Sequence, residues 1–343
     1  MLYLPNGYKP KLGLKQTQKA IKIIKDAFQR ELSTRLNLDR ITAPIMVKEG
    51  NGLNDDLSGV ERKVSFSVKA LNEDKVEIVQ SLAKWKRMAL YEYGYLPGEG
   101  IYTDMNALRP EEDLDNIHSI YVDQWDWEKV ITEDQRNLDF LKKTVRRIYE
   151  AIKVTENKLY VEFPQIEPML PENVFFIHSE ELLQRYPGMT PKEREDAVTK
   201  EYGAVFVIGI GGKLSDGSVH DGRSADYDDW TTPNEDGYLG LNGDLLLWNP
   251  VLGHAFEISS MGIRVDADAL ARQLELRGET GKSGLLYHRL LLEGGLPLTV
   301  GGGIGQSRLC MFLLRKAHIG EIQSSVWPER MRKMCHEAGI DLV

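Results

Sequence analysis

Apolar and polar residues alternate along this chain with two periods, one helical and one typical of strands. Residues 13–36 carry apolar side chains three or four positions apart, which predicts a long amphipathic helix. These positions are Leu14, Ile21, Ile24, Phe28, Leu32 and Leu36. Related patterns predict further helices over residues 81–92, 132–160, 179–186, 191–202, 266–277 and 305–316. Short apolar or alternating runs predict strands over residues 40–47, 64–71, 77–82, 119–127, 174–178, 204–210, 244–250 and 255–265.

The order of these elements predicts the fold class. The strands cluster without strict strand–helix alternation, which favours an antiparallel or mixed sheet over a doubly wound one. We therefore expect an α+β fold, a sheet flanked by helices, in a single domain over residues 1–343. No internal repeat, low-complexity tract or linker interrupts it.

Composition and charge narrow the class of protein. The longest apolar runs, such as AVFVIGI, are too short to span a bilayer, and the first residues lack the pattern of a signal peptide. Two cysteines cannot form a disulfide framework, so we expect a cytoplasmic protein without a membrane partner. The net charge of −9 offers little non-specific attraction for a phosphate backbone, and no nucleic-acid partner is expected.

One arginine-containing run combines charge with a strand pattern. In LRPEEDLDNIHSIYVDQWDWE, Arg109 precedes an alternating segment in which Gln124 and Asp126 share one face and two tryptophans share the other. A buried acid and amide suit an amino acid's ammonium group, and a guanidinium suits a polyphosphate. The alternative is a half-buried strand with a solvated polar face.

A second arginine follows a run of alternating glycines. In TVGGGIGQSR, Gly301, Gly303 and Gly305 allow close approach of backbone to a ligand, and Arg308 follows at a helix start. The run is not G-x-G-x-x-G, because Gln306 occupies the last glycine position. On its own it also fits a structural turn.

Adjacent acids occur in two polar loops. Asp55 and Asp56, and also Asp228 and Asp229, could hold an ammonium ion and accept its proton. Turn residues are the ordinary alternative for such positions.

Together the two arginine runs resemble motifs 2 and 3 of the class II aminoacyl-tRNA synthetase catalytic core. The resemblance places motif 1 at about residues 13–48, motif 2 at about 107–128 and motif 3 at about 299–316. It implies a homodimer built on motif 1. It also implies an ATP site formed by Arg109, Glu111, His118, Asp244, Gly303, Gly305 and Arg308, with Mg²⁺ held by Asp244 and Glu257. Alone, Asp244 would be read as a turn acid after Asn242-Gly243.

Two further segments resemble the aspartyl/asparaginyl branch of that class. VQSLAKWKRMAL aligns Ser81 and Lys86 with a serine and a carboxylate-binding lysine, while Lys84 and Arg87 fit an exposed basic helix face. EISSMGIR aligns Arg264 with an arginine that binds a substrate carboxylate. Ser259 and Ser260 replace two glycines there and would line the substrate site.

Nearly the whole chain, from about Lys15 to Trp327, resembles the ammonia-dependent asparagine synthetases. That resemblance implies ATP-dependent amidation of the L-aspartate β-carboxylate by free ammonia, through β-aspartyl-AMP, giving asparagine, AMP and pyrophosphate. It implies catalytic roles for Asp55, Lys86, Arg109 and Gln124. Substrate-binding roles are implied for Ser81, Lys86, Gln124, Asp126, Asp228, Asp229, Ser259, Ser260 and Arg264. Cys310, set among apolar residues, is expected to be an inert buried thiol rather than a glutaminase nucleophile.

Two other functions remain open at this point. A truncated aspartyl/asparaginyl-tRNA synthetase-like protein would charge a tRNA, but motif 1 begins too early to leave room for an anticodon-reading domain before it. A catalytically silent regulatory subunit would bind ATP without releasing pyrophosphate. The presence of Arg109, Glu111 and Arg308 argues against this second alternative.

Overall fold

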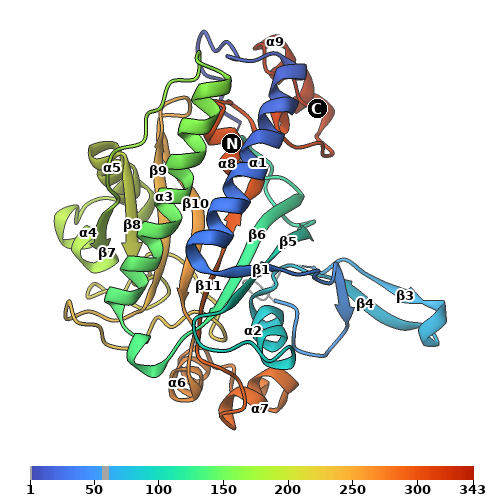
Figure 1. Ribbon diagram of the computed structural model, residues 1–343, viewed down its shortest axis with the longest axis vertical. Helices are drawn as coiled ribbons and strands as arrows, with labels where there is room; N and C mark the ends of the chain where they lie inside the picture. The colour runs from blue at the N-terminus through green and yellow to red at the C-terminus, as the bar shows by residue number, and fades with distance from the viewer. Residues whose placement is uncertain (1, 56–61) are drawn as a thin grey trace.

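A large mixed sheet forms the centre of the molecule (Figure 1), seen in a computed structural model that describes residues 2–55 and 62–343. Asp56, one of the paired acids, lies outside the described residues. In spatial order the strands are β1 (Leu38–Arg40), β5 (Gly100–Leu108), β6 (Tyr121–Val130), β11 (Thr299–Gly305), β10 (His254–Ile263), β9 (Asn242–Asn249), β8 (Ala204–Ile208) and β7 (Phe175–His178). The six central strands, which are β5, β6, β11, β10, β9 and β8, pair antiparallel with their neighbours in this order. At the two edges, β1 pairs parallel with β5 and β7 pairs parallel with β8. The predicted α+β class with a mixed sheet is confirmed.

Three helices cover one face of this sheet. They are α1 (Leu14–Leu36), α3 (Leu138–Glu162) and α8 (Gln306–Leu313), and α1 and α3 run side by side in Figure 1. The apolar stripe of α1, including Phe28, packs into one core with the apolar stripe of α3 and with Trp125 and Trp127 of β6. The Phe28 and Trp125 rings lie 4.7 Å apart, at their centroids. Burial of these aromatic rings holds the helical layer on the sheet.

Strand β6 divides its side chains between the two faces of the sheet. Trp125 and Trp127 are fully buried in the helical layer, whereas Gln124 and Asp126 line a cavity on the opposite face. This is the arrangement that the alternating pattern predicts.

Smaller elements surround the sheet. The other helices are α2 (Ala83–Glu92), α4 (Ser179–Arg185), α5 (Pro191–Tyr202), α6 (Ala267–Arg277), α7 (Leu286–Leu292) and α9 (Glu329–Glu337), with 3-10 turns η1 (Lys69–Leu71), η2 (Glu133–Gln135), η3 (Thr280–Gly284) and η4 (Ile319–Glu321). A second sheet, in the order β2 (Met46–Lys48), β4 (Asp74–Ile78) and β3 (Ser65–Val68), projects from the main body as an arm.

Several element predictions need correction. Residues 40–47 do not form one strand, because the segment around Pro44 separates β1 from β2. The predicted strand 77–82 lies mostly after β4, and 69–71 is a 3-10 turn. Strands β5 and β11 and helices α7 and α9 were not predicted, and the glycine run itself is strand β11.

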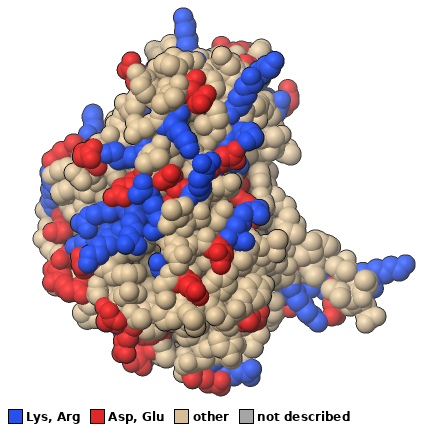
Figure 2. All heavy atoms as spheres, viewed as in Figure 1, with Lys and Arg blue, Asp and Glu red and all other residues tan. Residues whose placement is uncertain are grey.

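Charges of both signs are mixed over the face that α1 and α3 form (Figure 2). Arg35 of α1 and Glu150 of α3, for example, pair at 2.7 Å. Within the residues that the structure describes, none of the helices has the length and apolar character needed to cross a membrane.

Candidate active site

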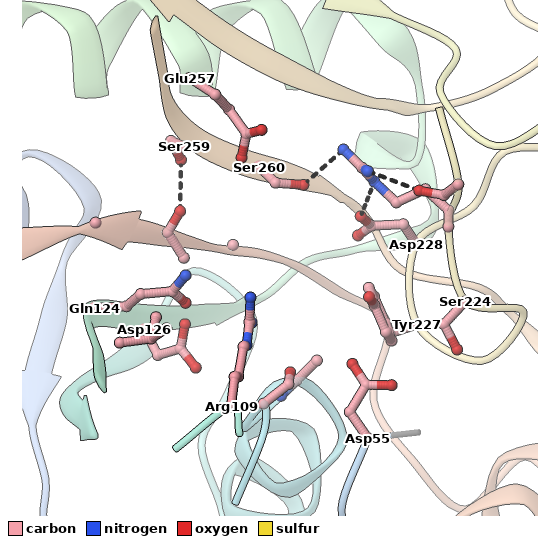
Figure 3. Close-up of a pocket in the computed structure, with 18 of the residues that line it drawn as sticks. Asp55, Arg109, Gln124, Asp126, Ser224, Tyr227, Asp228, Glu257, Ser259 and Ser260 are labelled. Carbon is pink, nitrogen blue, oxygen red and sulfur yellow. Dashed lines mark hydrogen bonds and ion pairs between the residues drawn. The ribbon is translucent and has the colours of Figure 1, made fainter. Parts of the chain in front are cut away.

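The face of the sheet opposite α1 and α3 forms the wall of a cavity of about 640 Å³ (Figure 3). Strands β6, β10 and β11 contribute to this wall, together with helix α2 and the loop that joins β8 to β9. Of the predicted site residues, those that line the cavity are Asp55, Ser81, Lys86, Arg109, His118, Gln124, Asp126, Asp228, Glu257, Ser259, Ser260, Arg264, Gly303, Gly305 and Arg308. Glu111, Asp229 and Asp244 do not line it.

Helix α2 delivers Lys86 to the cavity floor. Its ammonium group donates to the carbonyls of Trp127 (3.1 Å) and Gly302 (3.0 Å), and lies 3.5 Å from an Asp126 carboxylate oxygen. Burial lowers the pKa of Lys86 and raises the pKa of Asp126, while their mutual attraction opposes both shifts. The pair therefore places a cation and an anion side by side where a zwitterionic amino acid could bind.

Arg264 is anchored by two buried acids. Its Nε and Nη2 atoms donate to Glu128, at 3.0 and 2.9 Å, and its Nη1 donates to Asp228. Burial alone would raise the pKa of Glu128, but Arg264 holds it below its ordinary value. Because a guanidinium has five donors, one remains on each terminal nitrogen for a ligand carboxylate. Sequence reasoning missed Glu128, although its position two residues after Asp126 could have revealed it.

The alternating glycines of β11 leave space for these side chains. A Cβ on Gly301 would collide with the Glu128 carboxylate, and one on Gly303 would lie 2.7 Å from Asp126 Oδ1. The Ser259 hydroxyl donates to the Gly303 carbonyl at 2.9 Å and so joins β10 to this wall. The glycine run is thus a structural requirement of the cavity as well as a candidate nucleotide contact.

Two arginines from different motifs reach the cavity. Arg109 Nη2 donates to the Gln80 carbonyl at 3.4 Å, and its buried Nε has no hydrogen-bond partner among the described residues. Arg308 Nη1 donates to the Glu257 carbonyl at 3.2 Å. Both guanidiniums therefore keep donors for an anionic ligand.

The acid predicted to join Arg109 in the nucleotide site, Glu111, does not line the cavity. Glu111 is exposed and paired with Arg62, whereas Glu112 lines the cavity and lies 4.0 Å from Arg109 Nη1. His118 also lines the cavity and is held by Asp115, 3.0 Å from its Nδ1. Glu112, rather than the predicted Glu111, therefore lies where it could contact a ligand in the cavity.

Asp244 and Glu257 lie on neighbouring strands, as predicted, but they differ in exposure. Glu257 is partly exposed to the cavity, and Asp244 is buried behind the Arg223 guanidinium, with which it forms an ion pair. Burial and the Glu257 carboxylate raise the pKa of Asp244 to about 7, against the opposing effect of Arg223. No group of three or more acid, histidine or cysteine side chains among the described residues is arranged to hold a metal ion.

Asp55 and Asp228 approach the cavity from the side of Tyr227 (Figure 3). Both acids are buried, and together with burial itself they raise the pKa of the Tyr227 hydroxyl well above its ordinary value. Asp229, which was predicted to act beside Asp228, does not line the cavity. It binds Arg136 and accepts from the backbone amides of Thr231 (3.0 Å) and Thr232 (2.9 Å), so these groups of the protein itself occupy its carboxylate.

The basic residues of α2 are not an exposed face, contrary to the prediction. Lys84 forms a buried ion pair with Asp226 at 3.0 Å, and Arg87 donates to the backbone carbonyls of Pro297 and Val265. Asp226 also lies 3.0 Å from His288 of α7. Buried charges require such partners, and these come from segments distant in sequence. Cys310 is fully buried, as expected, and burial raises the pKa of its thiol to about 12.

Comparison with solved structures defines the class of fold. The asparaginyl-tRNA synthetase of Pyrococcus horikoshii, complexed with asparaginyl-adenylate, matches 92% of this chain and 70% of its own, with a TM-score of 0.67 and 17% identity. The corresponding Entamoeba histolytica synthetase matches 90% of this chain with a TM-score of 0.66 and 15% identity; the chain spans 66% of its length. The fold is that of the class II aminoacyl-tRNA synthetases.

Sequence comparison is more specific. The family model described as aspartate-ammonia ligase matches residues 15–339. The aspartate–ammonia ligase of Parabacteroides distasonis is 60% identical and that of Bacteroides thetaiotaomicron 58%, each over the whole of both chains. The Clostridium perfringens ligase is 57% identical, over all of this chain and 99% of its own. The chain belongs to the aspartate–ammonia ligase family.

Proposed function

We propose that this protein uses ATP to join free ammonia to the β-carboxylate of L-aspartate, giving L-asparagine, AMP and pyrophosphate. The observation that carries the proposal is that one cavity brings Arg109 and Arg308 together with the Lys86–Asp126 pair and Asp55. An activated-acid ligase needs a polyphosphate site, an amino-acid site and a place for the nucleophile in one enclosure. Family membership supports the same reaction.

In the first step an oxygen of the aspartate β-carboxylate attacks the α-phosphorus of ATP, and the bond to pyrophosphate breaks. Arg109 neutralises charge on the α-phosphate with its unpartnered Nε and its terminal nitrogens. Arg308 stacks on the adenine and contacts the γ-phosphate, and His118, Glu112, Gly303 and Gly305 complete the nucleotide site.

The aspartate is held by complementary charges. Asp126 and Gln124 accept from its ammonium group, and the free donors of Arg264 bind a carboxylate. Lys86 neutralises the other carboxylate of aspartate, the β-carboxylate, as it reacts. Ser81, Ser259 and Ser260 shape the surrounding wall.

In the second step the nitrogen of ammonia attacks the acyl carbon of β-aspartyl-AMP, and AMP leaves with the electrons of the broken C–O bond. Asp55, supported by Asp228, captures ammonium and accepts the proton that the nitrogen loses. Tyr227, whose hydroxyl stays protonated beside these acids, can donate a hydrogen bond there.

The donor set fits Mg²⁺ bound together with a triphosphate. Asp244 and Glu257 provide two hard carboxylates, and Mg²⁺ is commonly held by one or two carboxylates with substrate phosphates and water. When bound, the ion would neutralise phosphate charge. We further propose a cytoplasmic, single-domain protein that forms a homodimer through residues 13–48.

Product analysis tests the proposal. The purified protein is incubated with Mg·ATP, L-aspartate and ammonium chloride, and AMP, ADP, pyrophosphate and asparagine are quantified. Asparagine in a one-to-one ratio with AMP and pyrophosphate is expected. Formation of ADP, or AMP formation that depends on added tRNA, would contradict it. The full-length relatives favour the ligase over the tRNA-charging and silent-subunit alternatives.

A further inference from the structure

Arg223 also lines the cavity, but it belongs to neither of the two arginine motifs. It lies in the loop between β8 and β9 and its side chain is 11% exposed. Its Nη2 binds the Asp244 carboxylate and donates to the Ser260 hydroxyl at 3.0 Å. Its Nε lies 3.8 Å from Asp228 and makes no hydrogen bond to a described residue. The guanidinium thus separates Asp244 from the cavity.

The oxygen that Arg223 contacts is Oδ1 of Asp244, a carboxylate proposed above to hold a divalent cation. Two cations beside one carboxylate repel each other strongly in a buried site. A guanidinium and a divalent ion would therefore compete for Asp244. We infer that Arg223 and the divalent cation are alternative partners of Asp244, and that cation binding releases Arg223 to contact the pyrophosphate portion of the nucleotide. The inference rests on the proposed metal role of Asp244.

The position of Arg223 supports the second half of this inference. Glu257, the other proposed metal-holding acid, lies beside Arg308, at 3.8 Å between its carboxylate and Arg308 Nη1. A triphosphate bound over Asp244 and Glu257 would lie between the two guanidiniums. The long side chain of Arg223 can change its conformation. Its backbone is held separately, because Arg277 Nη2 donates to the Arg223 carbonyl at 3.0 Å. Its side chain can therefore change partner while the loop backbone stays in place.

Divalent-cation affinity provides a readout that does not depend on turnover. Mn²⁺ binding to the wild type and to Arg223→Gln is measured by electron paramagnetic resonance of the free ion, with no nucleotide added. A single charge within about 4–6 Å changes proton affinity by tenfold or more, so we expect Mn²⁺ to bind Arg223→Gln roughly tenfold more tightly. Pyrophosphate affinity, measured by calorimetry with Mg²⁺ present, is expected to fall by a similar factor.

Arg277→Gln is the matched control, because Arg277 also lines the cavity but does not contact Asp244. It removes the same charge and loosens the same loop. An equal gain in Mn²⁺ affinity in Arg277→Gln, or no gain in Arg223→Gln, would overturn the inference. If Arg223→Gln does not fold, Ser260→Ala keeps every charge and removes one acceptor of Arg223; a smaller gain in Mn²⁺ affinity is then expected, and its absence contradicts the competition.

Asp244→Asn separates this inference from the proposed function. If that substitution leaves Mn²⁺ affinity unchanged, the proposed metal role of Asp244 is wrong and the competition with Arg223 fails with it. If it weakens Mn²⁺ binding while Arg223→Gln behaves as the wild type does, Asp244 holds the ion and only the role of Arg223 is wrong. Neither result depends on the ammonia step.

Discussion

Gly303 and Asp126 are register partners on β11 and β6, and the missing side chain of one is the space that the other occupies. A methyl group on Gly303 would lie 2.7 Å from Asp126 Oδ1 and would also collide with the Gln124 amide. We expect Gly303→Ala to raise the KM for aspartate by a factor of about 5 to 150, since strain of about 1–3 kcal/mol from overpacking falls on the two side chains that hold its ammonium group. Steady-state kinetics with varied aspartate measures this.

Gly302→Ala is the control, because its methyl group would lie 2.5 Å from Met261 Cβ on the core side of the same strand. It should lower the free energy of unfolding and leave the aspartate KM less affected. Equal KM values in the two variants would show that backbone distortion, rather than the collision with Asp126, is responsible.

Asp55 should matter for the second step of the reaction. We expect Asp55→Ala to retain aspartate-dependent exchange of pyrophosphate into ATP while asparagine formation slows by a factor of about 10²–10⁴, the usual contribution of a positioned base. Glu279→Gln is the comparison, since Glu279 lines the cavity wall and pairs with Lys282 at 3.0 Å. If exchange and amide formation fall together in Asp55→Ala, Asp55 binds substrate or supports structure instead.

Asp229 should contribute to stability rather than to substrate binding. Its carboxylate is fully buried and binds Arg136 and the Thr231 and Thr232 amides. Removing one member of a buried ion pair typically costs about 3–5 kcal/mol. Asp229→Asn is expected to lower the free energy of unfolding in urea by a value near the bottom of that range, with the aspartate KM changed less than twofold. A large KM effect at unaltered stability would restore the substrate-binding role predicted for it.

His318 predicts a pH dependence of stability. Its buried Nδ1 accepts from the Gly320 amide at 3.0 Å, and burial lowers its pKa to about 4. The unfolded chain therefore binds a proton near pH 6.5, and the folded chain only near pH 4. The contribution of His318 to the free energy of unfolding is fully present above pH 6.5. About 3 kcal/mol of it is lost as the pH falls toward 4.

His318→Asn keeps a side-chain acceptor for the turn but cannot be protonated in this range. Urea unfolding at several values between pH 7 and pH 4 should therefore show a weaker decline in the variant than in the wild type. Parallel curves for the two proteins would exclude His318 as the source.

The parts of the fold that could be predicted are those whose signal is local. The period-two pattern of residues 119–127 correctly placed Trp125 and Asp126 on opposite faces of a strand, because adjacent strand residues face opposite sides. The glycine run was recognised as a close-approach segment but not as a strand, since glycine has low strand propensity and β11 is stabilised by its two neighbours.

The parts that could not be predicted depend on contacts between distant segments. Lys84 looked exposed because its partner Asp226 lies 142 positions away. The sequence did not distinguish Asp228 from Asp229, and only the loop geometry directs the first to the cavity and the second to Arg136. Arg223 carries no local signal, since its ion pair with Asp244 arises from the approach of its loop to β9.

The division of β6 between two faces has a consequence for folding. A slip of this strand by a single residue against β5 or β11 would send Trp125 and Trp127 into the aqueous cavity and would bury Gln124, Asp126 and Glu128 in hydrocarbon. Such a misfolded state would expose the two largest buried side chains and would leave ionised groups buried without partners. Packing of the two tryptophans therefore selects the strand register. A chain that packs them correctly against α1 has also placed the polar side chains of β6 on the cavity face.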